Sequence, residues 1–323
     1  MKSIKYFATI AATMFAAIAV YAQPGCDLKP TQTFLLYPEG QNVEKGLEGA
    51  LGPGESNGLT GEEYLLANGA NGNISDNARI DLYLPEEPNG QMIIVCPGGA
   101  YEYVAVYNEG VHVADWMTKN GITLAVVRYR MPNGHWEIPL RDVQNAFRFC
   151  RANASRWGVN QIGVMGFSAG GHLAACTSNM FTDEITRPDF SILIYPVITM
   201  EWEYTHEGTR NNLLGKDESW DDQELKAELV KRYSMEKNVT AATPQTFLAH
   251  STDDKGVPVI NSINYYNSLI ENGVSAEMHI YPTGGHGWGF NKDIYIGKGK
   301  DKLGYARPEF EASLKRWLES IRK

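Results

Sequence analysis

The sequence predicts an α/β fold in which a mostly parallel central sheet of about eight strands is covered by helices on both faces. Short apolar runs of strand length alternate along the chain with longer segments in which apolar residues recur at helical spacing. Most strand-length runs are apolar throughout, which is typical of parallel strands buried on both faces. No internal repeat interrupts the alternation, so we expect one large domain.

The first half of the chain opens on a glycine-rich arm. Residues 23–77 lack periodicity, and we expect them to lie on the surface with one short strand. A following strand stops at Pro85, and the next ends in Pro97-Gly98-Gly99. The expected elements are strands over 33–37, 78–84, 91–96 and 122–128, and helices over 106–119 and 140–157, the last with apolar residues at i, i+3, i+4, i+7 and i+11.

The second half continues this alternation around one charged segment. Residues 201–238 combine many charges with several aromatic residues and short helical patterns, so we expect a lid inserted over the sheet. The other elements expected are strands over 162–165, 190–196, 246–250 and 276–281, and helices from 169, over 259–271 and over 308–321. We therefore place a single α/β domain at 78–323, with ligands bound beyond the carboxyl ends of its strands.

A serine stands where one strand turns sharply into a helix. The pattern is Gly166-Phe167-Ser168-Ala169-Gly170, with an apolar strand before it and small residues after it. Glycines flank such a turn because it leaves little room, and the central side chain is lifted clear of the sheet. Ser168 is therefore a candidate nucleophile.

A serine hydroxyl needs a base, and one histidine stands in a suitable place. In enzymes with this type of turn, the acid and then the histidine follow the serine along the chain. His286 follows the strand over 276–281 in a glycine-flanked loop, which makes it the candidate base. The other histidines precede the serine or lie on its helix, in the lid, inside a strand or just before the candidate acids: His112, His135, His172, His206, His279 and His250.

The acid should also follow a strand. The strand over 246–250 leads into Asp253 and Asp254, and both qualify. Neighbouring side chains in an extended loop point in different directions, so one of them can orient His286 while the other faces solvent. The oriented carboxylate would hold the imidazole in the correct tautomer.

A third part of such a site is an oxyanion hole. The N–H of Ala169, directly after the serine, is one expected donor. The glycine-rich loop after the strand over 91–96 offers Gly98 and Gly99 as further donors, because glycines let the backbone approach a substrate closely.

Composition and termini limit the remaining classes of function. The chain has 323 residues and a net charge of −9, so a nucleic-acid or anionic-membrane partner is not expected. Residues 1–22 read as a signal peptide, which predicts a secreted or periplasmic protein without membrane insertion after cleavage; lipidation of Cys26 is a weaker alternative. Export permits a Cys150–Cys176 bridge, although buried free thiols are expected. No metal-binding motif is present, and no cofactor or metal is expected.

With these residues in hand, the chain resembles the secreted acetyl xylan esterase-like carbohydrate esterases, relatives of the catalytic domain of prolyl oligopeptidase. The resemblance runs from about residue 73 to the C-terminus. It rests on segments 73–76, 95–102, 109–110, 127–130, 139–144, 156–158, 162–173, 212–215, 243–262 and 284–287. It implies the α/β-hydrolase fold. The acid of that family stands four residues after a histidine and just before Val-Pro, which implies Asp254. Ala100 and Trp288 depart from the residues most common there.

The resemblance also implies a reaction. We expect hydrolysis of acetyl or other short acyl esters on plant cell-wall carbohydrate such as acetylated xylan, through Ser168, Asp254 and His286. The alternatives are a feruloyl or general short-chain carboxylesterase, an exopeptidase of the prolyl oligopeptidase type, or a carbohydrate-binding protein without activity. The aromatic residues expected to contact the substrate are Tyr101, Trp202, Trp220 and Trp288.

Overall fold

The computed structural model describes residues 28–37, 62–74, 78–132, 134–290 and 301–323. The expected signal peptide, Cys26 and most of the N-terminal arm lie outside these ranges. Within them, no helix is long and apolar enough to cross a membrane.

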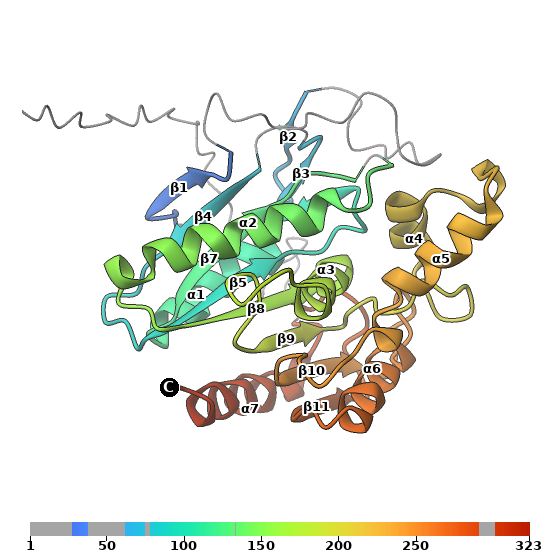
Figure 1. Cartoon of the computed structure of the whole chain (residues 1–323). Coiled ribbons are helices and arrows are strands. Elements are labelled where there is room, and N and C mark those ends of the chain that lie inside the picture. The colour runs from blue at the N-terminus through green and yellow to red at the C-terminus, as the bar shows by residue number, and fades with distance from the viewer. Residues whose placement is uncertain (1–27, 38–61, 75–77, 133, 291–300) are drawn as a thin grey trace, which may run out of the picture.

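A twisted sheet of eight strands runs through the centre of the molecule (Figure 1). Its order is β1-β4-β7-β5-β8-β9-β10-β11, and only the β1–β4 and β4–β7 pairs are antiparallel. In that order the strands span Gln32–Leu35, Arg79–Tyr83, Thr123–Arg128, Gln91–Cys96, Gln161–Phe167, Ser191–Ile194, Thr246–Ser251 and Ala276–Tyr281. This confirms the predicted mostly parallel sheet.

Helices cover both faces of the sheet because the strands are apolar on both. Along β5, Met92 and Ile94 face one hydrophobic cluster, while Ile93 and Val95 face the other. The first cluster contains buried residues of α2 (Ile138–Asn153), α3 (Ser168–Asn179) and α6 (Ile260–Glu271), and the second those of α1 (His112–Lys119) and α7 (Arg307–Ser320). Cys96, Cys150 and Cys176 are buried free thiols, as expected.

The structure adds short elements that the sequence did not predict. A second sheet joins β2 (Tyr64–Leu65), β3 (Ala70–Gly72) and β6 (Tyr103–Ala105). These strands are too short to produce a periodic pattern. The helix expected over 106–119 begins with a π-helical turn, η2 (Tyr107–Val111), and α2 ends in the 3₁₀ turn η3 (Ala154–Trp157). A further 3₁₀ turn, η6 (Gly304–Ala306), precedes α7.

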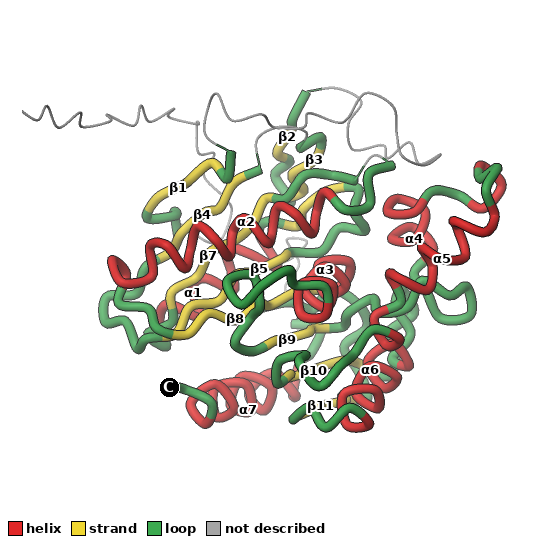
Figure 2. Tube along the Cα trace, in the orientation of Figure 1, coloured by secondary structure: helices red, strands yellow, loops and turns green. Residues whose placement is uncertain are grey.

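The lid segment, residues 201–238, contains two helices at one end of the sheet, to the right in Figures 1 and 2. It comprises α4 (Glu207–Leu214), η4 (Asp217–Ser219), α5 (Gln223–Tyr233) and η5 (Met235–Lys237). The side chains of His206 and Asp222 accept hydrogen bonds from the first turns of α4 and α5. Asn212 of α4 donates a 2.9 Å hydrogen bond to the carbonyl of Ala100, which attaches the lid segment to the loop after β5.

Candidate active site

Ser168 lies at the turn from β8 into α3 and has a strained backbone. Its φ of +53° falls in the left-handed region, which residues other than glycine rarely adopt. The flanking glycines are required by space. A Cβ on Gly170 would collide with the carbonyls of Cys96 and Pro97, and one on Gly166 would collide with the carbonyl of Gly170. The strand and helix therefore pack closely, as the sequence pattern predicted.

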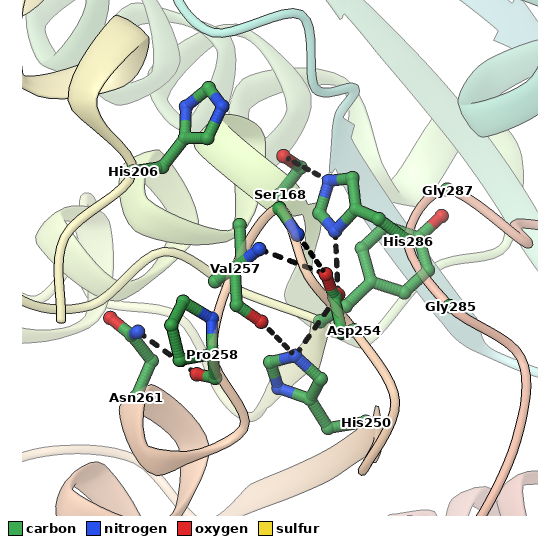
Figure 3. Close-up of polar contacts among 12 residues, drawn as sticks. Ser168, His206, His250, Asp254, Val257, Pro258, Asn261, Gly285, His286 and Gly287 are labelled. Carbon is green, nitrogen blue, oxygen red and sulfur yellow. Dashed lines mark hydrogen bonds and ion pairs between the residues drawn. The ribbon is translucent and has the colours of Figure 1, made fainter.

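Three side chains from separate strand ends meet here in a hydrogen-bonded row (Figure 3). The Oγ of Ser168 lies 2.8 Å from Nε2 of His286, and Nδ1 of His286 lies 2.7 Å from Oδ2 of Asp254. A carboxylate only accepts hydrogen bonds, so Nδ1 carries the proton and Nε2 is free to accept from the serine hydroxyl. This is the arrangement in which a histidine can take a proton from a serine.

Asp254 is held as an anion by several donors. The N–H groups of Gly256 and Val257 donate to its Oδ1 at 2.9 and 2.8 Å, and Nε2 of His250 lies 3.3 Å from its Oδ2. Burial alone would raise the pKa of this carboxyl, but the hydrogen bonds from His250 and His286 and the charge of His286 hold the pKa well below its ordinary value. The carboxyl is therefore ionised at neutral pH.

The neighbouring carboxylate has a different contact. Asp253 accepts a 2.7 Å hydrogen bond from the N–H of Gly285 and so holds the loop that carries His286. The two neighbours point in different directions, and the structure brings Asp254 to the histidine ring. The family pattern places a histidine, His250, four residues before Asp254, but the sequence did not predict that these two side chains are in contact.

The glycine-rich loop after β5 corrects one expectation. The N–H of Gly98 donates to Oε2 of the buried Glu109 at 2.6 Å, so it is not free to bind an oxyanion. Gly99 has a φ of +128°, and a Cβ there would collide with the carbonyl of Tyr103. The N–H of Ala169 lies in the first turn of α3, where N–H groups have no acceptor within the helix.

The expected substrate-contacting aromatic residues are mostly packed inside the protein, which is a second correction. Tyr101, Trp220 and Trp288 are buried; the hydroxyl of Tyr101 bonds to His172, and the indole N–H of Trp220 donates to the carbonyl of Leu214. Aromatic rings fill more core volume than other side chains, and sequence does not separate that use from ligand contact. Trp202 is 48% exposed in the lid segment.

His206, at the start of α4, faces the site from the lid segment (Figure 3). Its Nδ1 accepts a 3.1 Å hydrogen bond from the N–H of Thr209, so the neutral ring carries its proton on Nε2. Burial, and then the charge of His286, lower the pKa of His206 below its ordinary value. Within the described ranges, no group of three or more His, Cys, Asp or Glu side chains is placed to hold a metal ion.

Comparison with known proteins places this geometry in a family. The model of the BD-FAE family matches residues 80–269, which include Ser168 and Asp254. The chain belongs to this family of α/β-hydrolases. The match covers more than half of the sequence, and it confirms the resemblance and the fold predicted from the motifs.

Two similar proteins are named as an acetylxylan esterase and a xylanase. The chain is 41% identical over 224 residues to the acetylxylan esterase of Xylanibacter ruminicola, covering 68% of this chain and 45% of that protein. It is 33% identical over 217 residues to endo-1,4-beta-xylanase B of Butyrivibrio fibrisolvens, covering 60% of this chain and 32% of that protein. The chain thus spans less than half the length of these relatives.

A solved structure is also similar. The acetyl ester-xyloside bifunctional hydrolase of Caldicellulosiruptor lactoaceticus superposes with a TM-score of 0.66 at 34% identity, covering 76% of this chain and 88% of that one. A sugar hydrolase of Lactococcus lactis superposes with a TM-score of 0.63 at 28% identity, covering 76% of this chain and 95% of that one.

Proposed function

We propose that this protein is a secreted serine esterase that removes acetyl or other short acyl groups from carbohydrate such as acetylated xylan. The observation that supports the chemistry is the row of contacts from Ser168 through His286 to Asp254. The names of an acetylxylan esterase, a xylanase and an acetyl ester-xyloside hydrolase among similar proteins support the substrate class.

In the proposed reaction, the hydroxyl of Ser168 attacks the ester carbonyl while Nε2 of His286 takes its proton. The tetrahedral intermediate collapses to an acyl-serine, and the imidazolium returns the proton to the sugar oxygen as the alcohol leaves. A water molecule then attacks the acyl-serine with His286 as base, and the imidazolium returns the proton to the oxygen of Ser168 as acetate leaves. Asp254 keeps the ring in its Nδ1–H tautomer and stabilises the imidazolium, without itself taking the proton.

The negative oxygen of the intermediate needs donors. We propose the N–H groups of Gly99 and Ala169 for this role, since Gly98 is occupied by Glu109. Each such donor in a comparable site is worth about 100- to 1,000-fold in rate. Secretion is proposed from the lysine-bearing apolar segment over residues 1–22, and fractionation of expressing cells with N-terminal sequencing of the product tests it.

The decisive experiment measures acetate release from acetylated xylan by the wild type and by Ser168→Ala. We expect the variant to be inactive and to lose labelling by a fluorophosphonate probe, which reacts with an activated serine. Equal release by the two proteins would remove Ser168 from the mechanism. A series of p-nitrophenyl esters and a feruloyl ester then locates the acyl preference: rates that rise with chain length would favour a lipid esterase over an acetylesterase.

Two neighbouring carboxylates supply a matched pair of variants. Asp254→Asn leaves a side chain of the same shape but favours the wrong tautomer of His286, and we expect kcat to fall by about 1,000- to 10,000-fold. Asp253→Asn keeps an oxygen to accept from the N–H of Gly285, and we expect kcat to stay within about threefold of the wild type. The reverse ranking in kcat would show that the other aspartate orients the histidine.

A further inference from the structure

Glu109 is a buried carboxylate next to the candidate site. Its Oε2 accepts from the N–H of Gly98 at 2.6 Å, and its Oε1 accepts from the hydroxyl of Tyr195 at 2.8 Å. Buried carboxylates are costly, so their contacts usually matter. The steps assigned above to Ser168, His286 and Asp254 do not involve this group.

The contacts of Tyr195 continue to the loop that carries the histidine. Its hydroxyl accepts a 2.9 Å hydrogen bond from the N–H of Gly289, and its ring meets the ring of His286 edge-on with centroids 4.9 Å apart. Tyr195 follows β9 with a φ of +37°, a strained value for an aromatic residue. Gly98, Glu109, Tyr195 and Gly289 therefore form one buried line from the oxyanion loop, residues 97–101, to the histidine loop, residues 284–289.

The π-helical turn η2 supports this line from a second point. Asn108, beside Glu109 in that turn, donates a 3.2 Å hydrogen bond to the carbonyl of Gly287. A single turn thus contacts both loops through adjacent residues. Such π-helical turns are rare and occur frequently at functional sites.

The surroundings of Gly98 leave no room for a side chain at this position. A Cβ on Gly98 would lie 2.7 Å from Oε2 of Glu109 and 2.9 Å from Cβ of Ser168. The backbone of the oxyanion loop is therefore seated between the carboxylate and the candidate nucleophile. A shift of the carboxylate would move the loop relative to the serine.

The hydrogen-bond pattern suits the ionised form of Glu109. The hydroxyl of Tyr195 accepts from Gly289 and directs its own proton to Glu109, so both carboxylate oxygens act as acceptors. Burial raises the pKa of Glu109, while the hydrogen bonds from Tyr195 and Gly98 and the charges of His286 and Lys302 oppose the rise.

We propose that Glu109 is a positioning residue for the reaction. By joining Gly98 to Tyr195 and so to Gly289, it sets the N–H of Gly99 at the distance from Ser168 and His286 that the tetrahedral intermediate requires. This inference rests on the proposed esterase function. It predicts that loss of the carboxylate weakens transition-state binding much more than substrate binding.

The test uses Glu109→Ala and Glu109→Gln in the full chain. Active sites are counted with the fluorophosphonate, and hydrolysis of p-nitrophenyl acetate is then measured per active site. We expect kcat to fall about 100-fold or more in Glu109→Ala and about tenfold in Glu109→Gln, which keeps one acceptor, with KM within about threefold. Inhibition by a boronic acid, which forms a tetrahedral adduct on the serine, should weaken by the same factor as kcat/KM.

A matched control separates positioning from stability. Asp81 is also a buried carboxylate and pairs with Arg128 and Thr33 at the antiparallel side of the sheet. We expect Asp81→Asn to lower Tm while leaving kcat per active site unchanged. If the Glu109 variants only lose folded protein and keep kcat per active site within twofold of the wild type, the inference is wrong.

A second variant covers the case in which the Glu109 variants do not fold. Tyr195→Phe removes the hydroxyl that joins Glu109 to Gly289, and we expect kcat to fall about tenfold with an unchanged KM. Unchanged kcat would overturn the proposal. Failure of the wild type to hydrolyse any ester would overturn the esterase function itself, and full activity in Ser168→Ala would overturn the serine mechanism. An inactive Ser168→Ala with fully active Glu109 and Tyr195 variants would overturn this inference alone.

Discussion

At the scale of single residues, burial decides what a histidine can do. His172 lies one turn after Ser168 in α3, but both of its ring nitrogens are engaged. Nδ1 lies 2.9 Å from the hydroxyl of Tyr101, and Nε2 lies 2.7 Å from the carbonyl of Tyr233. The carbonyl only accepts, so Nε2 carries a proton, and burial lowers the pKa of the ring, which favours its neutral form. His172 is thus packed inside the protein, where it links the oxyanion loop to the lid segment.

The buried ring predicts an acid-dependent loss of stability. Burial lowers the pKa of His172 to about 4, whereas an exposed histidine in the unfolded chain titrates near 6.5. The unfolded state therefore binds the proton first, so His172 costs no stability above about pH 6.5 and an increasing amount as the pH falls towards 4. The full cost is about 3 kcal/mol.

Urea unfolding of the wild type and His172→Gln at pH 7 and pH 4.5 measures this contribution. At pH 7 we expect the variant to be less stable, because the cavity and hydrogen bonds suit a neutral imidazole. At pH 4.5 the difference should shrink or reverse. An equal difference in free energy of unfolding at both pH values would contradict the assignment.

Some contacts of single residues could not be predicted from the local sequence. Asp253 and Asp254 are adjacent and both follow β10, so local pattern leaves both open as partners of His286. The family resemblance favours Asp254, and the coordinates place it 2.7 Å from the ring. Glu109 lies in segment 109–110 of the family resemblance, but the sequence carried no indication of its contacts, because its partners, Gly98 and Tyr195, lie 11 and 86 residues away.

At the scale of elements, the junction of β8 and α3 depends on the absence of side chains. Gly170 has no positive φ, so its requirement is one of space alone. A Cβ there meets backbone carbonyls of the neighbouring strand end, which cannot move aside as a flexible side chain can. The local pattern predicted the sharp turn for this reason.

The corresponding prediction concerns Gly170→Ala. We expect a loss of about 4 kcal/mol or more, with little soluble protein, because β5 and α3 are forced apart. Gly273→Ala is the control: its φ is +72° but no heavy atom lies within 4 Å of its Cβ position, so only backbone strain of about 1 kcal/mol is expected. Similar yields and similar urea midpoints for the two variants would contradict a steric requirement at Gly170.

At the scale of the whole molecule, a buried ion pair joins elements from distant parts of the chain. The guanidinium of Arg130, after β7, contacts both carboxylate oxygens of Asp142 in α2, with 2.7 Å between Nη2 and Oδ1. The hydroxyl of Tyr37, after β1, donates to the same carboxylate at 2.7 Å. These contacts therefore connect the ends of β1 and β7 to the covering helix α2.

Asp142→Asn tests how much this buried ion pair contributes to the stability of the fold. Removing the charge leaves a buried guanidinium without its counterion, and we expect a cost of about 3–5 kcal/mol and a Tm lower by roughly 10 °C. Asp183→Asn removes a partner of Arg148 at the surface, where both side chains are about 40% exposed, and should barely change Tm. Calorimetry of the two variants gives the comparison, and equal Tm values would show that the buried pair adds nothing.

The sequence by itself determined the alternation of strands and helices, the turn that presents Ser168, and the order of serine, acid and histidine along the chain. These features are encoded locally, in apolar periodicity and in glycines that a sharp turn requires. Only the tertiary structure decided that the N–H of Gly98 is occupied by Glu109, that Tyr101, Trp220 and Trp288 fill the interior, and that β1 joins the central sheet. Such contacts depend on which distant side chains share one small volume, and no local pattern records that.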